Sequence, residues 1–170
     1  MAKRDFFSQE RKKTSLRKIS GGKEMAERCA ECGAVLSEGS TCQTIFEEFL
    51  SLEYTDPAYG QVHFFTVACF MIQHGRYSDE ALTGMLPLLR ASLDEQLPAQ
   101  QLRERAARGM NEATRTWKVT RQAGASPLPK IAWTLTIADV AQSMQDPEKY
   151  CEHVKQWARV TLQQMPALLR

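Results

Sequence analysis

Residues 29–42 read Cys-Ala-Glu-Cys-Gly-Ala-Val-Leu-Ser-Glu-Gly-Ser-Thr-Cys, which places three cysteines within fourteen residues of a 170-residue chain. Cys29 and Cys32 have the Cys-x-x-Cys spacing at which two thiolates converge on one metal ion. Gly33 follows directly, and glycine readily takes the tight conformation that points backbone amides at the sulfurs. Cys42 supplies a third thiol. The pattern therefore predicts a zinc-knuckle-like loop over residues 29–42, which we call the knuckle and which holds most of a metal site.

The segment after the knuckle has the pattern of two helices. Apolar side chains recur mostly every three or four positions from Cys42 to about Tyr54, and this spacing predicts an amphipathic helix. Asp56-Pro57 breaks that helix. A second, more apolar and buried helix is expected from about Tyr59 to His74, with Gly75 as its natural stop. Because the turn between them is short, we expect the two helices to run antiparallel as a helical hairpin.

A site with three thiolates requires a fourth ligand. The sequence offers five candidates, which are His63, Cys69, His74, Cys151 and His153. In an antiparallel hairpin, the start of the first helix at Cys42 neighbours the end of the second at His74. His63 lies near the turn, roughly 16 Å from His74 at about 1.5 Å per residue, so these two histidines cannot share one ion. The geometry favours His74 as the fourth ligand, and His63 becomes the ligand if the hairpin is wrong.

The remaining cysteines and histidine have simpler interpretations. Cys69 and Cys151 fall on apolar helical positions, where a free cysteine packs as a small hydrophobic residue. His153 is expected on the solvated face of the last helix. For the Cys29 and Cys32 pair itself, a thiol redox pair and two unremarkable cysteines remain as alternatives to a metal site.

Helix signals continue towards the C-terminus. Ser78 is a good N-cap with acidic residues in the next turn, and it predicts a helix that Pro87 kinks or ends. A charged helix is expected over about residues 99–119. A loop is expected over residues 123–130, which contain two prolines and a glycine.

Two capping patterns begin the last helices. Thr136 with Asp139 three residues later resembles a capping box and predicts a short helix to about Met144. Asp146 followed by Pro147 starts a longer helix to about residue 165, with one apolar stripe facing the core. No segment has a convincing strand pattern. The expected fold class is therefore all-α: a small helical bundle with the knuckle packed on the helical hairpin.

The charge is distributed unevenly over the chain. Residues 1–23 carry eight basic and two acidic side chains, a net charge of +6, whereas residues 24–170 carry 14 basic and 18 acidic side chains, a net charge of −4. We expect residues 1–24 to form a basic tail that is disordered or a frayed helix, because such a segment has too little apolar surface to offset the entropy of ordering. A hydrophobic content of 43% then suits a single helical domain over residues 25–170.

Three features of the sequence bear on the cellular compartment of the protein. No stretch approaches the roughly twenty apolar residues of a membrane span, and the N-terminus has no apolar run typical of a secretory signal. Five cysteines, an odd number, fit a reducing compartment with metal ligands or free thiols better than a disulfide framework. We therefore expect a cytoplasmic protein with no membrane partner.

Several motifs along the chain match those of one family. They are Cys29-x-x-Cys32-Gly33, Cys42, Tyr59-Gly60-x-Val62-His63, Val67, Gln73-His74, Trp133-Thr134 and Trp157-Ala158-Arg159. With these motifs, about residues 27–165 resemble a bacterial family known only as domain of unknown function 5946. The resemblance implies a small, mainly helical cytoplasmic protein with a metal-binding cluster of cysteine and histidine and no assigned activity. The family usually has proline after the Gln-His pair, where this chain has Gly75.

Two classes of function fit this pattern. In the first, zinc is structural and the protein is a binding or regulatory module for a protein partner, because four protein ligands close a site to substrate. In the second, one position is open to water and the protein is a metal-dependent hydrolase or thiol enzyme, with Glu47, Glu48 or His63 as proton carriers. We favour the first, because Cys-x-x-Cys knuckles are mostly closed sites.

Two further alternatives stay open. Residues 1–23 carry enough positive charge to contact phosphates, so nucleic-acid binding is a third, weaker interpretation. Thiolate-rich ligand sets also accept iron and other soft ions, so the sequence favours zinc without excluding them.

Overall fold

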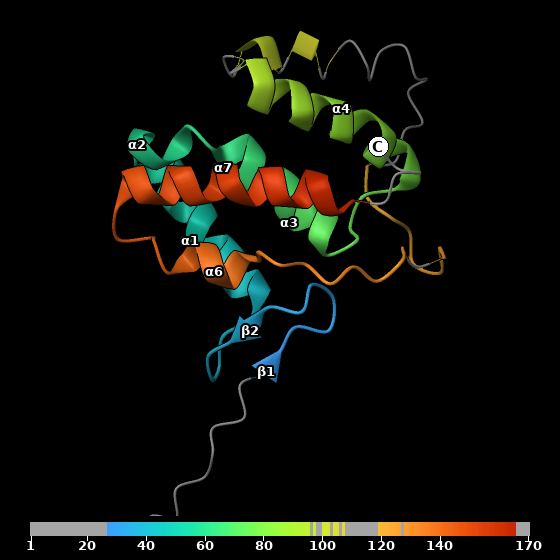
Figure 1. Ribbon diagram of the computed structural model, residues 1–170, viewed down its shortest axis with the longest axis horizontal. Helices are drawn as coiled ribbons and strands as arrows, with labels where there is room; N and C mark the ends of the chain where they lie inside the picture. The colour runs from blue at the N-terminus through green and yellow to red at the C-terminus, as the bar shows by residue number, and fades with distance from the viewer. Residues whose placement is uncertain are drawn as a thin grey trace, which may run out of the picture.

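The computed structural model of the chain describes residues 27–95, 97, 100–102, 104, 105, 107, 119–126 and 128–165. Helices dominate these residues, and one two-stranded sheet stands at their N-terminal end (Figure 1). The elements are β1 (Glu27–Arg28), β2 (Val35–Leu36), α1 (Cys42–Thr55), α2 (Pro57–Gly60), α3 (His63–Gln73), α4 (Asp79–Glu95), α6 (Ile137–Ala141) and α7 (Pro147–Gln164). The all-α fold class is confirmed. The tail predicted over residues 1–24 and most of the helix predicted over 99–119 lie outside the described residues.

The sheet is a difference from the sequence-based expectation, which included no strand. β1 and β2 pair antiparallel, with Glu27 opposite Leu36 and Arg28 opposite Val35. Each strand has two residues, which is too short for an alternating pattern to be visible in the sequence. The strands flank the Cys-x-x-Cys turn and bring its two ends together.

The hairpin has an extra element between its two long helices. The Asp56 side chain accepts a hydrogen bond from the backbone N–H of Ala58 at 2.9 Å, and it thereby caps a new four-residue helix, α2, that begins at Pro57. α3 begins only at His63. The single helix expected from Tyr59 to His74 is therefore wrong in its first turn, because the Asp-Pro cap starts a separate short helix there.

The end of α3 follows the expectation for a glycine stop. Gly75 has φ +61°, and the backbone N–H of Arg76 donates to Met71 O at 2.8 Å while that of Gly75 donates to Ile72 O at 3.0 Å. This pair of bonds is the Schellman motif, which satisfies the last carbonyl groups of a helix. It leaves His74 as the capping residue of α3, at a fixed position.

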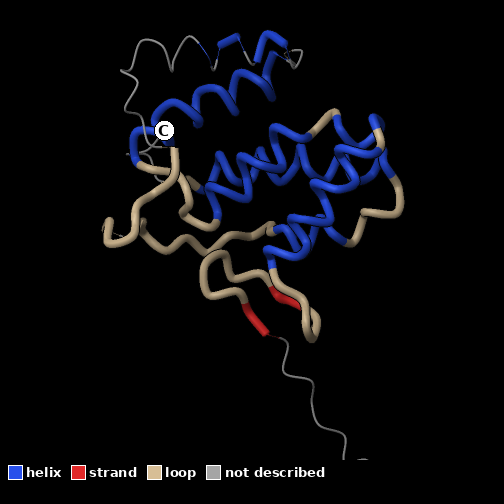
Figure 2. Tube along the Cα trace, turned by 180° about the vertical axis from the view of Figure 1, so that it is seen from behind, coloured by secondary structure: helices blue, strands red, loops and turns tan. Residues whose placement is uncertain are grey.

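The hydrophobic core lies between the long helices. α3 and α7 lie side by side at the centre, α4 packs on both of them, and α1 packs on α3 and α6 from the other side (Figure 1 and Figure 2). The apolar stripe predicted for the last helix is buried, and its members are Cys151, Val154, Trp157, Ala158, Thr161, Leu162 and Met165. No helix within the described part of the chain is long and apolar enough to span a bilayer.

Three predicted helix starts are present. Ser78 Oγ accepts from Ala81 N at 3.1 Å, and Asp146 Oδ1 accepts from two backbone N–H groups at the start of α7. Thr136 and Asp139 form the reciprocal capping box of α6. These local signals were readable because each depends on neighbouring residues alone.

Pro87 does not end its helix, because α4 continues to Glu95. Leu86 and Leu89 on either side of the proline are buried, with 3% and 0% of their surface exposed. Their packing offsets the hydrogen bond that proline cannot donate.

Candidate metal centre

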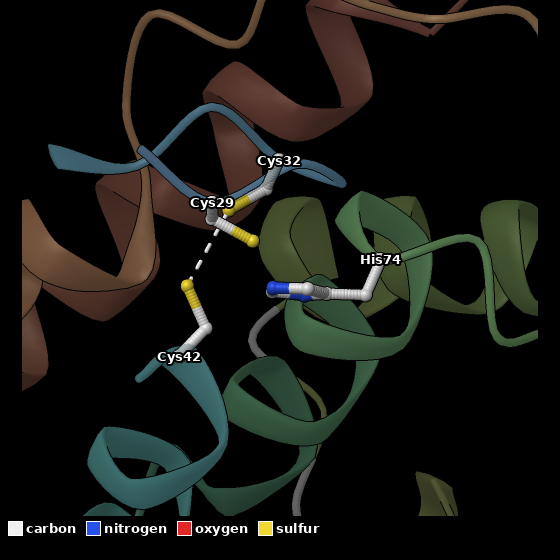
Figure 3. A group of neighbouring side chains, drawn as sticks. All are labelled: Cys29, Cys32, Cys42 and His74. Carbon is white, nitrogen blue, oxygen red and sulfur yellow. Dashed lines mark hydrogen bonds between the residues drawn. The ribbon is translucent and has the colours of Figure 1, made fainter. Parts of the chain in front are cut away.

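The knuckle turn is closed by its own backbone. Cys29 N donates to Ala34 O at 2.9 Å, and Gly33 N donates to Cys29 O at 2.9 Å. Gly33 has φ +78°, a conformation that side-chain-bearing residues rarely adopt, which explains the glycine after the second cysteine. Cys32 is 2% exposed, and Cys29 is partly buried. The turn therefore directs two thiols from one loop towards the helices (Figure 3).

Cys42 is the first residue of α1. Thr41 caps that helix, and its hydroxyl oxygen accepts from Thr44 N at 3.0 Å while Thr41 N donates to Thr44 Oγ1 at 3.0 Å. The box fixes the first turn and with it the direction of the Cys42 side chain, which is buried.

His74 presents a prepared ligand atom. Its Nδ1 lies 2.8 Å from the backbone carbonyl oxygen of Phe70, which can only accept, so Nδ1 carries the proton. The Nε2 atom is buried and has no hydrogen-bond partner among the described residues. The ring also packs on that of Phe70, with 4.2 Å between the centroids. Such a carbonyl bond on one nitrogen is how proteins orient a histidine whose other nitrogen binds a metal.

The four side chains converge on one point. The Sγ atoms of Cys29, Cys32 and Cys42 and a ring nitrogen of His74 all lie within 4.8 Å of one another (Figure 3). The Cys32 and Cys42 sulfurs are 3.6 Å apart, close to the roughly 3.8 Å that tetrahedral geometry gives for Zn–S bonds of about 2.3 Å. A set of three thiols and one imidazole is also the donor chemistry that Zn²⁺ prefers. The four residues therefore fit one zinc ion.

The electrostatics of the cluster favour a thiolate. A hydrogen bond from the Cys42 thiol outweighs burial and holds the pKa of Cys32 well below its usual range. The same hydrogen bond, together with burial, raises the pKa of Cys42. The hydrogen-bonded pair thus favours one thiolate, and a bound cation would favour the others in turn.

The other candidate ligands lie elsewhere. His63 Nδ1 is 2.8 Å from Glu53 Oε2, and His63 is not part of the cluster. Cys69 is fully buried in the core, and Cys151 donates to Ala58 O at 3.3 Å. His153 is exposed. The antiparallel arrangement inferred from the sequence thus places His74, and not His63, beside Cys42.

A buried polar network at the opposite end of α1 escaped the sequence analysis. The Glu53 side chain is 0% exposed and accepts hydrogen bonds from Tyr150 Oη at 2.6 Å, Thr66 Oγ1 at 2.5 Å and His63. Burial and the Glu53 carboxylate raise the pKa of Tyr150, so its phenol stays a donor at neutral pH. A sequence signal existed, because Glu53 falls four residues after the buried Phe49, on the apolar face of α1.

Comparisons with known proteins give a family and nothing more specific. A family model described as "Family of unknown function (DUF5946)" matches residues 27–166, a range that includes the knuckle and the helices from α1 to α7. No curated protein and no solved structure matches the chain.

Proposed function

The chain belongs to this family of unknown function, and we propose that it is a zinc-binding helical protein in which the metal is structural. Cys29, Cys32, Cys42 and Nε2 of His74 would form a tetrahedral shell. Four protein ligands leave no position for substrate, which is typical of structural zinc. The observation that carries the proposal is the convergence of these four ligand atoms within 4.8 Å.

The surroundings of the site support a structural role. The two strands beside the Cys-x-x-Cys turn pair with each other. Before Cys42, the side chains that this segment buries in the core are Cys32, Ala34 and Leu36. The ion pair between Arg76 and Glu31, at 2.9 Å, is half exposed and so contributes little. A metal ion would connect the Cys-x-x-Cys turn to the start of α1 through Cys42 and to the end of α3 through His74.

Among the described residues, the proton carriers proposed for the enzyme alternative lie outside the cluster. Glu47 and Glu48 are exposed on α1, and Glu47 accepts from Gln43. His63 is engaged by Glu53. The four-residue cluster contains no carboxylate. We therefore assign the protein the role of a binding or regulatory module with a protein partner.

The compartment is part of the same proposal. None of the five cysteines forms a disulfide, which suits a reducing compartment such as the cytoplasm. Nucleic-acid binding through residues 1–23 stays a weaker proposal, because a basic terminus is usually a solvated arm.

Metal content tests the ligand set. We expect purified wild-type protein to contain one zinc per chain by mass spectrometry. His74→Ala should lose it, because three thiolates without Nε2 leave the shell incomplete. His63→Ala is the matched control and should retain the metal, because that histidine bonds to Glu53. A wild-type protein without metal, or zinc that survives both substitutions, would contradict this ligand set.

A further inference from the structure

The three cysteines of the candidate metal centre differ in how far solvent reaches them. Cys29 is partly buried, whereas Cys32 and Cys42 are only 2% and 4% exposed. Figure 3 shows the three side chains converging from the knuckle turn and from α1, with the ring of His74 beside them. A small oxidant in solution therefore meets the cluster on the side of Cys29, and the two other sulfurs stand next to it.

Cys32 and Cys42 are placed to form a disulfide. Their sulfurs are 3.6 Å apart and share a hydrogen bond, and a disulfide requires about 2.05 Å, so an approach of roughly 1.6 Å is needed. Cys42 is fixed at the capped start of α1, whereas Cys32 lies in a turn between two strands of two residues each. The approach therefore falls on the turn and leaves the helix in place.

The other two cysteines lie outside this chemistry. Cys69 is 0% exposed in the core, and burial raises its pKa, which keeps it a thiol. Cys151 is 7% exposed and donates to Ala58 O at 3.3 Å. Because peroxides react with accessible thiolates, oxidation should be confined to the knuckle cluster.

We propose that the candidate metal centre is a redox switch, in which a peroxide converts Cys32 and Cys42 to a disulfide and the zinc ion leaves. The inference rests on the proposed structural zinc and adds the regulation of that site. Zinc itself has no redox chemistry, so the electrons come from the sulfurs.

The reaction balances with a peroxide as the only co-reactant. One thiolate attacks hydrogen peroxide, the O–O bond breaks, and a sulfenic acid and a hydroxide ion form. The second thiolate attacks the sulfenic sulfur, which forms the S–S bond and expels a second hydroxide. The two sulfurs lose two electrons, the peroxide gains them, and both hydroxides take protons from the buffer. Zn²⁺ keeps only Cys29 and His74 as ligands and leaves as the hydrated ion.

Oxidation separates the knuckle from α3 but not from α1. The disulfide keeps the turn joined to Cys42, whereas the Nε2 atom of His74 is buried and has no other partner among the described residues. A cavity of about 320 Å³ borders this junction, between Ala30 and Glu31 of the knuckle, the end of α3 and the long loop before α6. Without zinc, water must reach His74, because a buried polar atom without a partner is costly. The oxidised protein thus stays folded and presents a different surface here.

Peroxide titration of zinc-loaded, full-length protein tests the switch. We expect a small molar excess of hydrogen peroxide to release one zinc per chain, measured with a chromogenic zinc indicator, and dithiothreitol with added zinc to restore it. A protease that cleaves after glutamate separates the three cysteines at Glu31, Glu38 and Glu47. Mass spectrometry of the unreduced digest should therefore show peptides 32–38 and 39–47 joined by a disulfide.

Cys151→Ser is the matched control variant, because it removes a cysteine outside the cluster. It should release zinc at the same peroxide concentration as the wild type, and Cys69 should stay reduced in both proteins. Hydrogen exchange adds a positional readout. In the oxidised protein the N–H of Arg76 at the end of α3 should lose protection, whereas that of Ile45 in the first turn of α1 should keep it.

Two results would overturn the proposal: zinc that stays bound in millimolar peroxide, or zinc release without the joined peptides. Zinc content before oxidation tests the metal site separately. A zinc-loaded protein that does not respond to peroxide contradicts the switch alone. A protein without zinc that still joins peptides 32–38 and 39–47 contradicts the structural metal and supports the thiol pairing.

Discussion

Cys32→Ser should release the zinc and lower the free energy of unfolding by about 4 kcal/mol or more. The substitution replaces one of four soft ligands with a hydroxyl that Zn²⁺ binds poorly, and it leaves the knuckle without its tie to α1 and α3. For a chain of this length the melting temperature should fall by roughly 10 °C or more. Thermal unfolding monitored by circular dichroism, with and without a chelator, measures both effects.

Cys151→Ser is the matched control for this variant. It makes the same chemical change at a buried cysteine outside the cluster, and serine can still donate to the Ala58 carbonyl that Cys151 contacts at 3.3 Å. We expect it to keep its zinc and to stay sensitive to the chelator. Cys32→Ser should be insensitive to the chelator, because its metal is already lost. Equal melting temperatures and equal zinc content in the two variants would contradict a structural metal.

Hydrogen exchange distinguishes local from global loss of structure in the same experiment. The backbone N–H groups of Cys29 and Gly33 are bonded within the knuckle turn, and the N–H of Arg76 is bonded at the end of α3. When the metal is removed, these amides should lose protection first, since they lie beside the ligands. Amides in the middle of α7, which packs in the core, should lose protection only at the temperature of global unfolding.

The parts of the fold that the sequence predicted are those that neighbouring residues determine. Gly33, Gly75 and Asp146 each act on the one or two turns beside them, so their roles could be read directly. The nearness of Cys42 and His74 is a longer-range inference, which was possible because a short connection leaves two helices little choice but to run antiparallel. The four-residue helix α2 does not disturb that direction.

The parts that the sequence missed depend on distant partners. Tyr150 bonds to Glu53 from a position 97 residues away, and no local pattern records such a contact. The helix α4 continues beyond Pro87 because α3 and α7 pack against it. Helix propensity alone could not predict this continuation, because it does not include tertiary packing. The cavity beside the metal centre is formed by a loop and a knuckle whose relative position only the folded chain specifies.

Glu53→Ala should cost about 3–5 kcal/mol in the free energy of unfolding, the second large effect that we expect. The carboxylate accepts hydrogen bonds from three side chains that belong to α3 and α7. Its removal leaves the buried Tyr150 phenol without an acceptor, leaves Thr66 only its long bond to Val62 O at 3.4 Å, and opens a space between three helices. Urea unfolding at neutral pH, followed by tryptophan fluorescence, measures the loss.

Two control variants separate the network from general effects of mutation. Glu53→Gln keeps the shape and one acceptor oxygen, so it should cost about 1–2 kcal/mol. Glu48→Ala removes an exposed carboxylate from the same helix, so it should change stability by less than about 0.5 kcal/mol. If Glu53→Ala and Glu48→Ala unfold at the same urea concentration, the buried network does not stabilise the fold.

Zinc content should be unchanged in all three glutamate variants. Glu53 lies eleven residues after Cys42 on α1, about 16 Å along the helix axis, and it shares no partner with the metal ligands. Effects at sites this far apart are close to independent. The helical hairpin therefore has the proposed metal site at one end and a buried carboxylate at the other, and we expect the two to act independently. Loss of zinc in Glu53→Ala under conditions where the protein is still folded would contradict that separation.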